Sequence, residues 1–326
     1  MTITLPTTRP TFDELKKRDG PYLNAWGIWG KDNQHGQTNL ITPEAVKRGV
    51  AAVEHGITIN LNLPLRDKAF ESAFRGPVVQ EVIDYGNWYD DKVSFNTQSS
   101  TQWDGYRHAP YQGYPEKGQQ TYYGGLAAAD VKNPDKHDYG IQRELIWRKP
   151  VTTRAVLLDI PRYIAKHNLA PLDPLTSNTP VTLALLEGAA NDQGVEFAEG
   201  DVLLVRTGFT EALKALTPEQ HKELNLMNGV IGVESKEEVA RWHWENGFAA
   251  VATDALAYES FPFHEGRSPL HEVFLAGWGL PIGELFDLRE LARVADEKQK
   301  WTFLFTSMAL NLDGGVASPA NAQVIL

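Results

Sequence analysis

Residues 235–253 read SKEEVARWHWENGFAAVAT, and this stretch sets our expectation for the fold. Ser235 and Glu238 stand three residues apart in the pattern of a capping box, which predicts that a helix begins at Ser235. Gly247 suits the left-handed conformation that commonly ends a helix. The apolar run over 248–253 follows at once and is typical of a buried strand. A helix that leads directly into a buried strand indicates the α/β class.

The same alternation of strand-like and helix-like runs extends along the chain in both directions. β-Branched and aromatic residues favour strands over residues 57–63, 78–85, 92–96, 155–160, 202–206 and 301–312. Threonine can cap a helix and proline fits its first turn, so three pairs predict helix starts: Thr42-Pro43, Thr179-Pro180 and Thr217-Pro218. No linker divides these elements. We therefore expect a single domain over residues 1–326, with an N-terminal arm over residues 1–24.

An aromatic-rich segment over residues 85–125 departs from this alternation. Between residues 85 and 123 it holds ten aromatic residues, including seven of the 11 tyrosines, together with many Gly, Gln and Pro residues. Such a segment is too polar for a core strand and too aromatic for a disordered linker. We expect a structured active-site insertion that lies over a pocket. The alternative is an aromatic cluster that holds a long surface loop in place.

The composition excludes several classes of protein and of site. The chain has 326 residues, with 31 Lys and Arg against 42 Asp and Glu, and its formal net charge is −11. This acidic balance disfavours nucleic acid and anionic membranes as partners, so a small molecule is the expected ligand. The absence of Cys excludes disulfides, thiolate nucleophiles and cysteine metal sites. Residues 1–20 lack the apolar core of a signal peptide, and we expect a cytoplasmic protein.

One polar cluster is the first candidate for chemistry, because serine-nucleophile and phosphate-binding motifs are absent. Residues 98–108 read QSSTQWDGYRH and contain two amides, a carboxylate and an imidazole. In a straight strand Gln98, Gln102 and Asp104 would share one face, but the two glutamines would lie about 13 Å apart. Metal–ligand bonds are only about 2 Å long, so a shared site requires the chain to turn between them. The alternative is a polar strand end with hydrogen-bonded glutamines.

A second polar cluster lies further along the chain. His264, His271 and Glu284 stand in the stretch HEGRSPLHEVFLAGWGLPIGE. Ser268-Pro269 predicts a helix start before His271, and the Gly-Leu-Pro sequence breaks any continuous helix before Glu284. Taken alone, each of these side chains is more typical of a surface group or a hydrogen-bonded polar group.

The two clusters together resemble the cyclase family that includes bacterial kynurenine formamidase and isatin hydrolase. The family signature reads His-x-Gly-Thr-His-x-Asp-x-Pro-x-His, and this chain keeps its Thr, its Asp and its last His as Thr101, Asp104 and His108. The similarity spans residues 25–320. It includes NLITPEAVKRGVAAVEHGITINLNLPL (39–65), GDVLLVRTG (200–208), GVESKEEVARWHWENG with the following VATD (232–247 and 251–254), and LHEVFLAGWGLPIGELFDL (270–288). The resemblance implies a mixed β-sheet flanked by helices, of the swivelling β/β/α type.

The resemblance also implies roles for single residues. In the family, the first two signature histidines, the Asp, a later His and a later Glu hold a divalent metal, and the last signature His is the acid and base. By position the ligands here would be Gln98, Gln102, Asp104, His271 and Glu284, with His108 as the catalytic residue. Because amide oxygens replace two imidazoles, such a site would suit manganese, magnesium or calcium better than zinc. Alternatively the metal is lost and the glutamines bind substrate or water.

Three functions compete on this basis. The leading hypothesis is a hydrolase of an amide, lactam or cyclic ester bond in a small aromatic or apolar carbonyl compound, with His108 and Asp104 as the catalytic pair. Trp103 and Tyr106 would then lie beside the substrate, and packing is the alternative role for both rings. The second hypothesis is a metal-free lyase, isomerase or cyclase that uses His108 and Asp104. The third is a non-catalytic, ligand-binding member. The family resemblance further implies a homo-oligomer.

Overall fold

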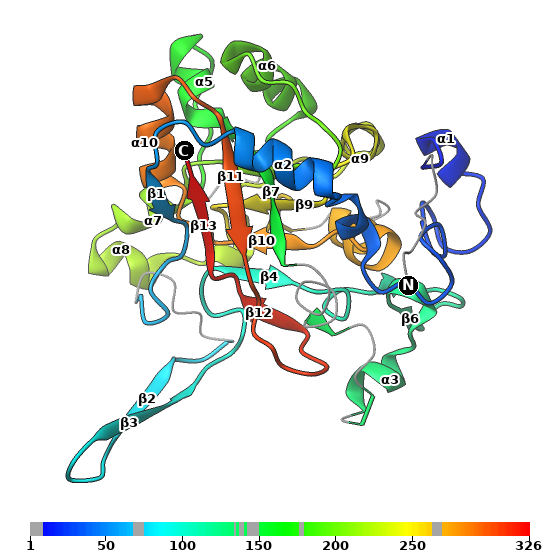
Figure 1. The fold of residues 1–326 in the computed structure, drawn as a ribbon, viewed down its shortest axis with the longest axis horizontal. Coiled ribbons are helices and arrows are strands. Elements are labelled where there is room, and N and C mark those ends of the chain that lie inside the picture. The colour runs from blue at the N-terminus through cyan, green and yellow to red at the C-terminus, as the bar shows by residue number, and fades with distance from the viewer. Residues whose placement is uncertain are drawn as a thin grey trace.

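A nine-stranded mixed sheet forms the centre of the molecule (Figure 1). This computed structural model describes residues 9–67, 75–133, 135–136, 140–141, 150–175, 179–262 and 269–326. In order across the sheet the strands are β1 (Thr58–Asn60), β13 (Ala322–Ile325), β11 (Thr302–Ser307), β7 (Val151–Asp159), β8 (Val202–Arg206), β9 (Ala250–Thr253), β10 (Ile282–Glu284), β4 (Gln102–Asp104) and β12 (Ala317–Pro319). Strands β7 to β10 pair in parallel, and the other neighbouring pairs are antiparallel. The predicted α/β class and mixed sheet are confirmed.

Helices pack against the sheet and leave a hydrophobic core on each of its faces. Strand β8 shows the division, because Leu203 and Val205 belong to one core while Val202 and Leu204 belong to the other. The helices are α1 (Phe12–Leu15), α2 (Pro43–Ala51), α3 (Ala128–Lys132), α5 (Ile160–Lys166), α6 (Leu183–Gln193), α7 (Phe209–Lys214), α8 (Pro218–Glu223), α9 (Glu237–Asn246) and α10 (Arg289–Lys298), with short 3₁₀ turns at Gly36–Leu40, Tyr123–Gly125 and Leu226–Asn228. Among the described residues, none of the helices is long and apolar enough to cross a membrane.

Two of the three predicted Thr-Pro helix starts are confirmed. Thr42 accepts a hydrogen bond from the backbone of the first turn of α2, and Thr217 forms a capping box at the start of α8. The start predicted at Thr179-Pro180 is wrong, because the chain there is still extended and Val181 N–H donates to the Gly232 carbonyl at 2.7 Å. Helix α6 begins three residues later, where Thr182 provides the cap.

Helix α9 ends as predicted but starts differently. Gly247 adopts the left-handed conformation, with φ of 69°, and β9 follows from Ala250. The predicted capping box is wrong: Lys236 is the N-cap residue, and no side chain caps the helix. The hydroxyl of Ser235 donates instead to the carboxylate of Glu259. Ser235 is therefore used for a tertiary contact next to the polar site described below.

The aromatic-rich segment is structured, but it consists of short strands and turns. Strands β2 (Val79–Asp84) and β3 (Tyr89–Ser94) form a hairpin that projects from the body (Figure 1). Strand β4 joins the central sheet, and β5 (Tyr111–Gln112) pairs with β6 (Gln120–Thr121). The expectation that this segment is too polar for a core strand is wrong for β4, whose three residues are all buried.

Candidate active site

Strand β4 separates polar from apolar side chains by simple alternation. Gln102 and Asp104 point to one face of the sheet and Trp103 points to the other, since successive side chains in a strand alternate. The antiparallel pairing with β10 places Gln102 opposite Glu284. As a result Gln102 Nε2 donates to Glu284 Oε2 at 2.8 Å. Two segments far apart in the sequence thus bring an amide and two carboxylates to one buried face.

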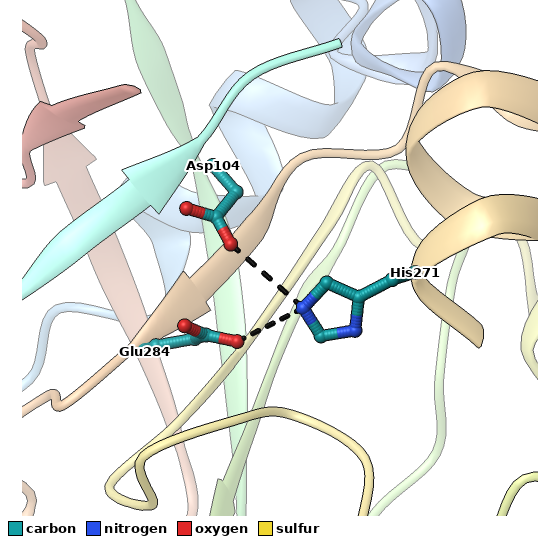
Figure 2. A group of neighbouring side chains, drawn as sticks. All are labelled: Asp104, His271 and Glu284. Carbon is teal, nitrogen blue, oxygen red and sulfur yellow. Dashed lines mark hydrogen bonds and ion pairs between the residues drawn. The ribbon is translucent and has the colours of Figure 1, made fainter. Parts of the chain in front are cut away.

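His271 reaches the same face from the turn that precedes a π-helix, η5 (Glu272–Trp278). The predicted Gly-Leu-Pro break is confirmed, because Gly279 ends this helix in the left-handed conformation and β10 follows. Nε2 of His271 lies 3.1 Å from Glu284 Oε1 and 3.8 Å from Asp104 Oδ2 (Figure 2). His264 and Ser268 of the predicted cluster lie outside the described residues.

Gln98 and His108 complete the polar cluster around Asp104. The chain turns after Asn96, whose carbonyl accepts the Ser99 N–H at 2.9 Å, and this turn brings Gln98 back toward β4. Gln98 Nε2 donates to Asp104 Oδ1 and lies 3.4 Å from His108 Nε2. His108 Nε2 lies 3.6 Å from Asp104 Oδ2, and its side chain is 28% exposed. His108 is thus the imidazole that faces solvent, while His271 is buried.

The protonation states of these groups are linked by their shared, buried space. Burial raises the pKa of Asp104, and the negative charge of Glu284 adds to this effect, while the two histidines oppose it. Burial alone would lower the pKa of His271, but hydrogen bonds to Glu259 and Glu284 hold it well above its usual range. Burial acts to raise the pKa of Glu284, yet the hydrogen bond from His271 leaves it lowered. In this arrangement His271 is protonated and donates to both glutamates.

One oxygen of Asp104 marks a position that a divalent cation fits. Within the described residues, Asp104 Oδ2 is buried without a hydrogen-bond partner. The ligand atoms of Asp104, His271 and Glu284 all lie within 4.8 Å of one another. Two carboxylates and an imidazole suit such an ion, and His271 would lose its Nε2 proton on binding. The oxygens of Gln98 and Gln102 would join the set only if their amides turned, because their nitrogens face the carboxylates.

Two charged residues of the site carry no signal in the sequence. Glu259 is fully buried, and its carboxylate accepts hydrogen bonds from His271 Nδ1 at 2.8 Å, from the backbone N–H groups of Leu270 and His271, and from the Ser235 hydroxyl. Arg75 Nη1 donates to the Gln98 carbonyl at 2.6 Å. Neither residue stands in a recognisable motif, and each reaches the site only through the fold. Glu259 fixes the ring orientation of His271, as carboxylates commonly do for ligating histidines.

The two aromatic residues expected beside the substrate lie elsewhere. Trp103 is fully buried on the opposite face of β4, where its ring contacts Phe286 and Phe305 edge to face. Tyr106 is also fully buried, and its hydroxyl donates to the His35 carbonyl at 2.9 Å. Neither ring has surface left for a substrate in this structure. The expectation is corrected in favour of packing, because sequence adjacency to Asp104 does not place a side chain on the same face.

Comparisons with known proteins agree with this architecture. A search of curated proteins gives no match. The crystal structure of a protein described as a novel cyclase has a TM-score of 0.80 and 27% sequence identity, and the alignment covers 93% of this chain and 99% of that chain. Two more distant structures share the fold. They are isatin hydrolase A from Labrenzia aggregata (TM-score 0.56, 13% identity, 84% of this chain and 94% of that chain) and a predicted metal-dependent hydrolase from Bacillus stearothermophilus (TM-score 0.51, 16% identity, 82% and 97%).

The family model confirms the resemblance seen in the sequence. A family described as putative cyclase matches residues 28–260, a range that includes the 98–108 segment and ends before His271. Because this match covers more than half of the chain, the protein belongs to the putative cyclase family.

Proposed function

We propose that the protein is a hydrolase that cleaves an amide, lactam or cyclic ester bond in a small carbonyl compound. The observation that carries this proposal is the position of His108, a partly exposed imidazole 3.6 Å from the buried Asp104 carboxylate. Membership of the cyclase family supports an enzyme, and the fold shared with isatin hydrolases supports hydrolysis. The cytoplasmic location and the single domain over residues 1–326 stay predictions from the sequence.

In the proposed reaction His108 moves one proton twice. It takes a proton from water as the water oxygen bonds to the carbonyl carbon, and it returns that proton to the leaving nitrogen or oxygen as the old bond breaks. Asp104 stabilises the imidazolium in between, because its carboxylate is close and buried. General acid–base catalysis of this kind contributes about 10²- to 10⁴-fold in rate.

The site further supports a divalent metal, for which Asp104, His271 and Glu284 are the proposed ligands. When bound, such an ion polarises a carbonyl and makes water more acidic. If the amides of Gln98 and Gln102 turned to offer their oxygens, the resulting set of four oxygens and one nitrogen would suit manganese better than zinc, which prefers imidazole or thiolate ligands. Glu259 would hold the His271 ring with Nε2 toward the ion.

The decisive test is the variant His108→Ala, assayed on a panel of aryl formamides, lactams and lactones. We expect kcat/KM to fall at least about 100-fold while circular dichroism shows an unchanged fold. The control is His55→Ala, which removes an exposed histidine far from His108 in the sequence and should leave the rate unchanged. An unchanged rate in His108→Ala would rule out the proposed mechanism.

A metal-free lyase, isomerase or cyclase that uses the same pair is the second candidate. It is favoured by one observation: the amide nitrogens of Gln98 and Gln102 already donate to the carboxylates of Asp104 and Glu284. Elemental analysis of untagged protein, followed by dialysis against a chelator, separates the two proposals. Activity that disappears with the metal and returns with manganese supports the hydrolase, whereas activity that survives complete removal supports the second candidate.

We also propose a homo-oligomer in which the β2–β3 hairpin contacts a second copy of the chain. An isolated two-stranded hairpin is only marginally stable in water, and exposed apolar patches often mark contact surfaces. Six apolar side chains in this hairpin are between 45% and 68% exposed: Val79, Val82, Tyr85, Trp88, Tyr89 and Val93. In sedimentation equilibrium we expect the wild type to be an oligomer and the Trp88→Ser, Tyr89→Ser variant to shift toward monomer. A monomeric wild type would contradict the proposal.

A further inference from the structure

The side chain of Gln102 is held between a carboxylate and a cation. Its Nε2 donates to Glu284 Oε2 at 2.8 Å, and its Oε1 lies 3.4 Å from Nη1 of Arg75. The same Arg75 nitrogen donates to the backbone carbonyl of Gln98 at 2.6 Å, which fixes the guanidinium beside the amide. Gln102 has no exposed surface, so water does not compete for either end of its amide.

These two neighbours favour the same orientation of the amide. An amide nitrogen only donates hydrogen bonds and an amide oxygen only accepts them. Turning the Gln102 amide would place Nε2 against the guanidinium donors of Arg75 and Oε1 against the Glu284 carboxylate. Both contacts would become repulsive. The observed orientation is therefore the one that both charged groups stabilise.

A divalent cation bound by Asp104, His271 and Glu284 would favour one orientation of the Gln102 amide, while Arg75 would favour the opposite one. The ion attracts the amide oxygen of Gln102, while Arg75 still holds that oxygen on its own side. Arg75 also interacts electrostatically with both carboxylates, so its positive charge opposes that of the ion. The orientation of the Gln102 amide and the positive charge of Arg75 therefore both weaken cation binding.

We propose that Arg75 is a positioning residue that keeps the Gln102 amide turned with its nitrogen toward Glu284, and that it thereby limits the affinity of the site for divalent cations. The inference deepens the proposed function and rests on the metal site proposed there. It assigns a purpose to the glutamine that stands in place of an imidazole ligand, because turning the amide exchanges a donor for an acceptor, so that a neighbouring charge selects which of the two faces the ion.

The test measures cation binding and does not depend on turnover. Arg75→Met removes the charge at similar length, and Arg66→Met is the matched control, since Arg66 is exposed and contacts only Gln80 on the hairpin among its described hydrogen bonds. Manganese affinity is measured by calorimetry and by the electron paramagnetic resonance signal of the free ion. We expect Arg75→Met to bind manganese at least about tenfold more tightly than wild type, and Arg66→Met to match wild type. Circular dichroism checks folding, and Arg75→Gln provides the same loss of charge if the Met variant does not fold.

A double-mutant cycle then separates positioning from charge. In a Gln102→Met background the amide is gone, so the gain from Arg75→Met should shrink to less than about threefold. An undiminished gain would overturn the positioning role, because Arg75 would then act by charge alone. No gain in Arg75→Met, or no binding by any variant, would overturn the inference outright. The hydrolysis proposal is tested separately by His108→Ala, so its failure is distinguishable from this one.

Discussion

Strand β4 and the β2–β3 hairpin are joined by one short turn, yet they lie in opposite environments. All three residues of β4 are buried between β10 and β12, whereas every residue of β3 is exposed and pairs only with β2. Both regions mix polar with aromatic side chains. Residue type along a strand therefore does not decide whether the strand is buried. Hydrogen-bond partners decide burial here, because Gln102 and Asp104 of β4 are paired with Glu284 and Gln98 from other segments.

The largest expected effect follows from removing the apolar side of β4. Trp103 is fully buried against Phe286 and Phe305, and its indole N–H donates to the Ser307 hydroxyl at 2.8 Å. Trp103→Ala should lower the free energy of unfolding by about 3 to 5 kcal/mol, since it leaves a large cavity and removes the hydrogen bond that the Ser307 hydroxyl accepts from the indole. Urea denaturation measures the loss, and Trp103→Phe should cost much less. A loss below about 1 kcal/mol would mean that β4 is not part of the cooperative core.

The rule drawn from β4, that buried polar groups depend on their partners, extends to His243. Burial lowers the pKa of this residue to about 4, although its contact with the Val239 carbonyl opposes the shift. Its neutral ring lies 2.8 Å from that carbonyl and 2.7 Å from the Tyr258 hydroxyl. Below pH about 6.5 the unfolded chain binds a proton that the folded chain does not. Stability should therefore fall by about 3 kcal/mol as the pH drops from about 6.5 to about 4.

The control for this pH dependence is His243→Gln, which removes the titrating group. Other carboxylates and histidines titrate in both proteins, so the difference between the two stability curves isolates His243. Urea denaturation at intervals between pH 4 and pH 7 provides both curves. The wild-type curve should be steeper across this window, and parallel curves would show that His243 is not buried in its neutral form.

The next effect concerns the polar side of β4. If Gln98 and Gln102 stand where imidazole ligands would stand, the double variant Gln98→His, Gln102→His offers three nitrogens and two carboxylates to one ion. Zinc affinity should rise by about two orders of magnitude, because zinc prefers imidazole to amide oxygen. Competitive zinc titration by calorimetry measures the gain, with circular dichroism to confirm folding. A folded double variant that binds zinc no more tightly than wild type would favour a metal-free site.

The sequence predicted the parallel centre of the fold better than the strands that carry the site. Residues 202–206 match β8 without error, because a continuous apolar run is typical of a strand buried on both faces. Strands β4, β10, β12 and β13 were not predicted, since each is only three or four residues long and, unlike the equally short β1 and β9, stands in no longer run of β-branched and aromatic residues. The polar cluster around Asp104 was a candidate from its residue types, and the family resemblance then joined it to His271 and Glu284. Glu259 and Arg75 were not found, because only tertiary structure brings them to His271 and Gln102.

The smallest expected effect on stability concerns the β2–β3 hairpin, where Trp88 provides the comparison with Trp103. Trp88 is 59% exposed, and its ring stacks on Tyr85 with the centroids 5.9 Å apart. Trp88→Ala is the same substitution as Trp103→Ala, but it opens no cavity in the core, so stability should change by only about 0.5 kcal/mol. The urea denaturation should be done at protein concentrations low enough to keep the chain monomeric, because loss of a partner contact would otherwise add to the effect. A loss above about 2 kcal/mol in the monomer would mean that the hairpin packs on the body of its own chain. The contrast between the hairpin and β4 would then no longer hold.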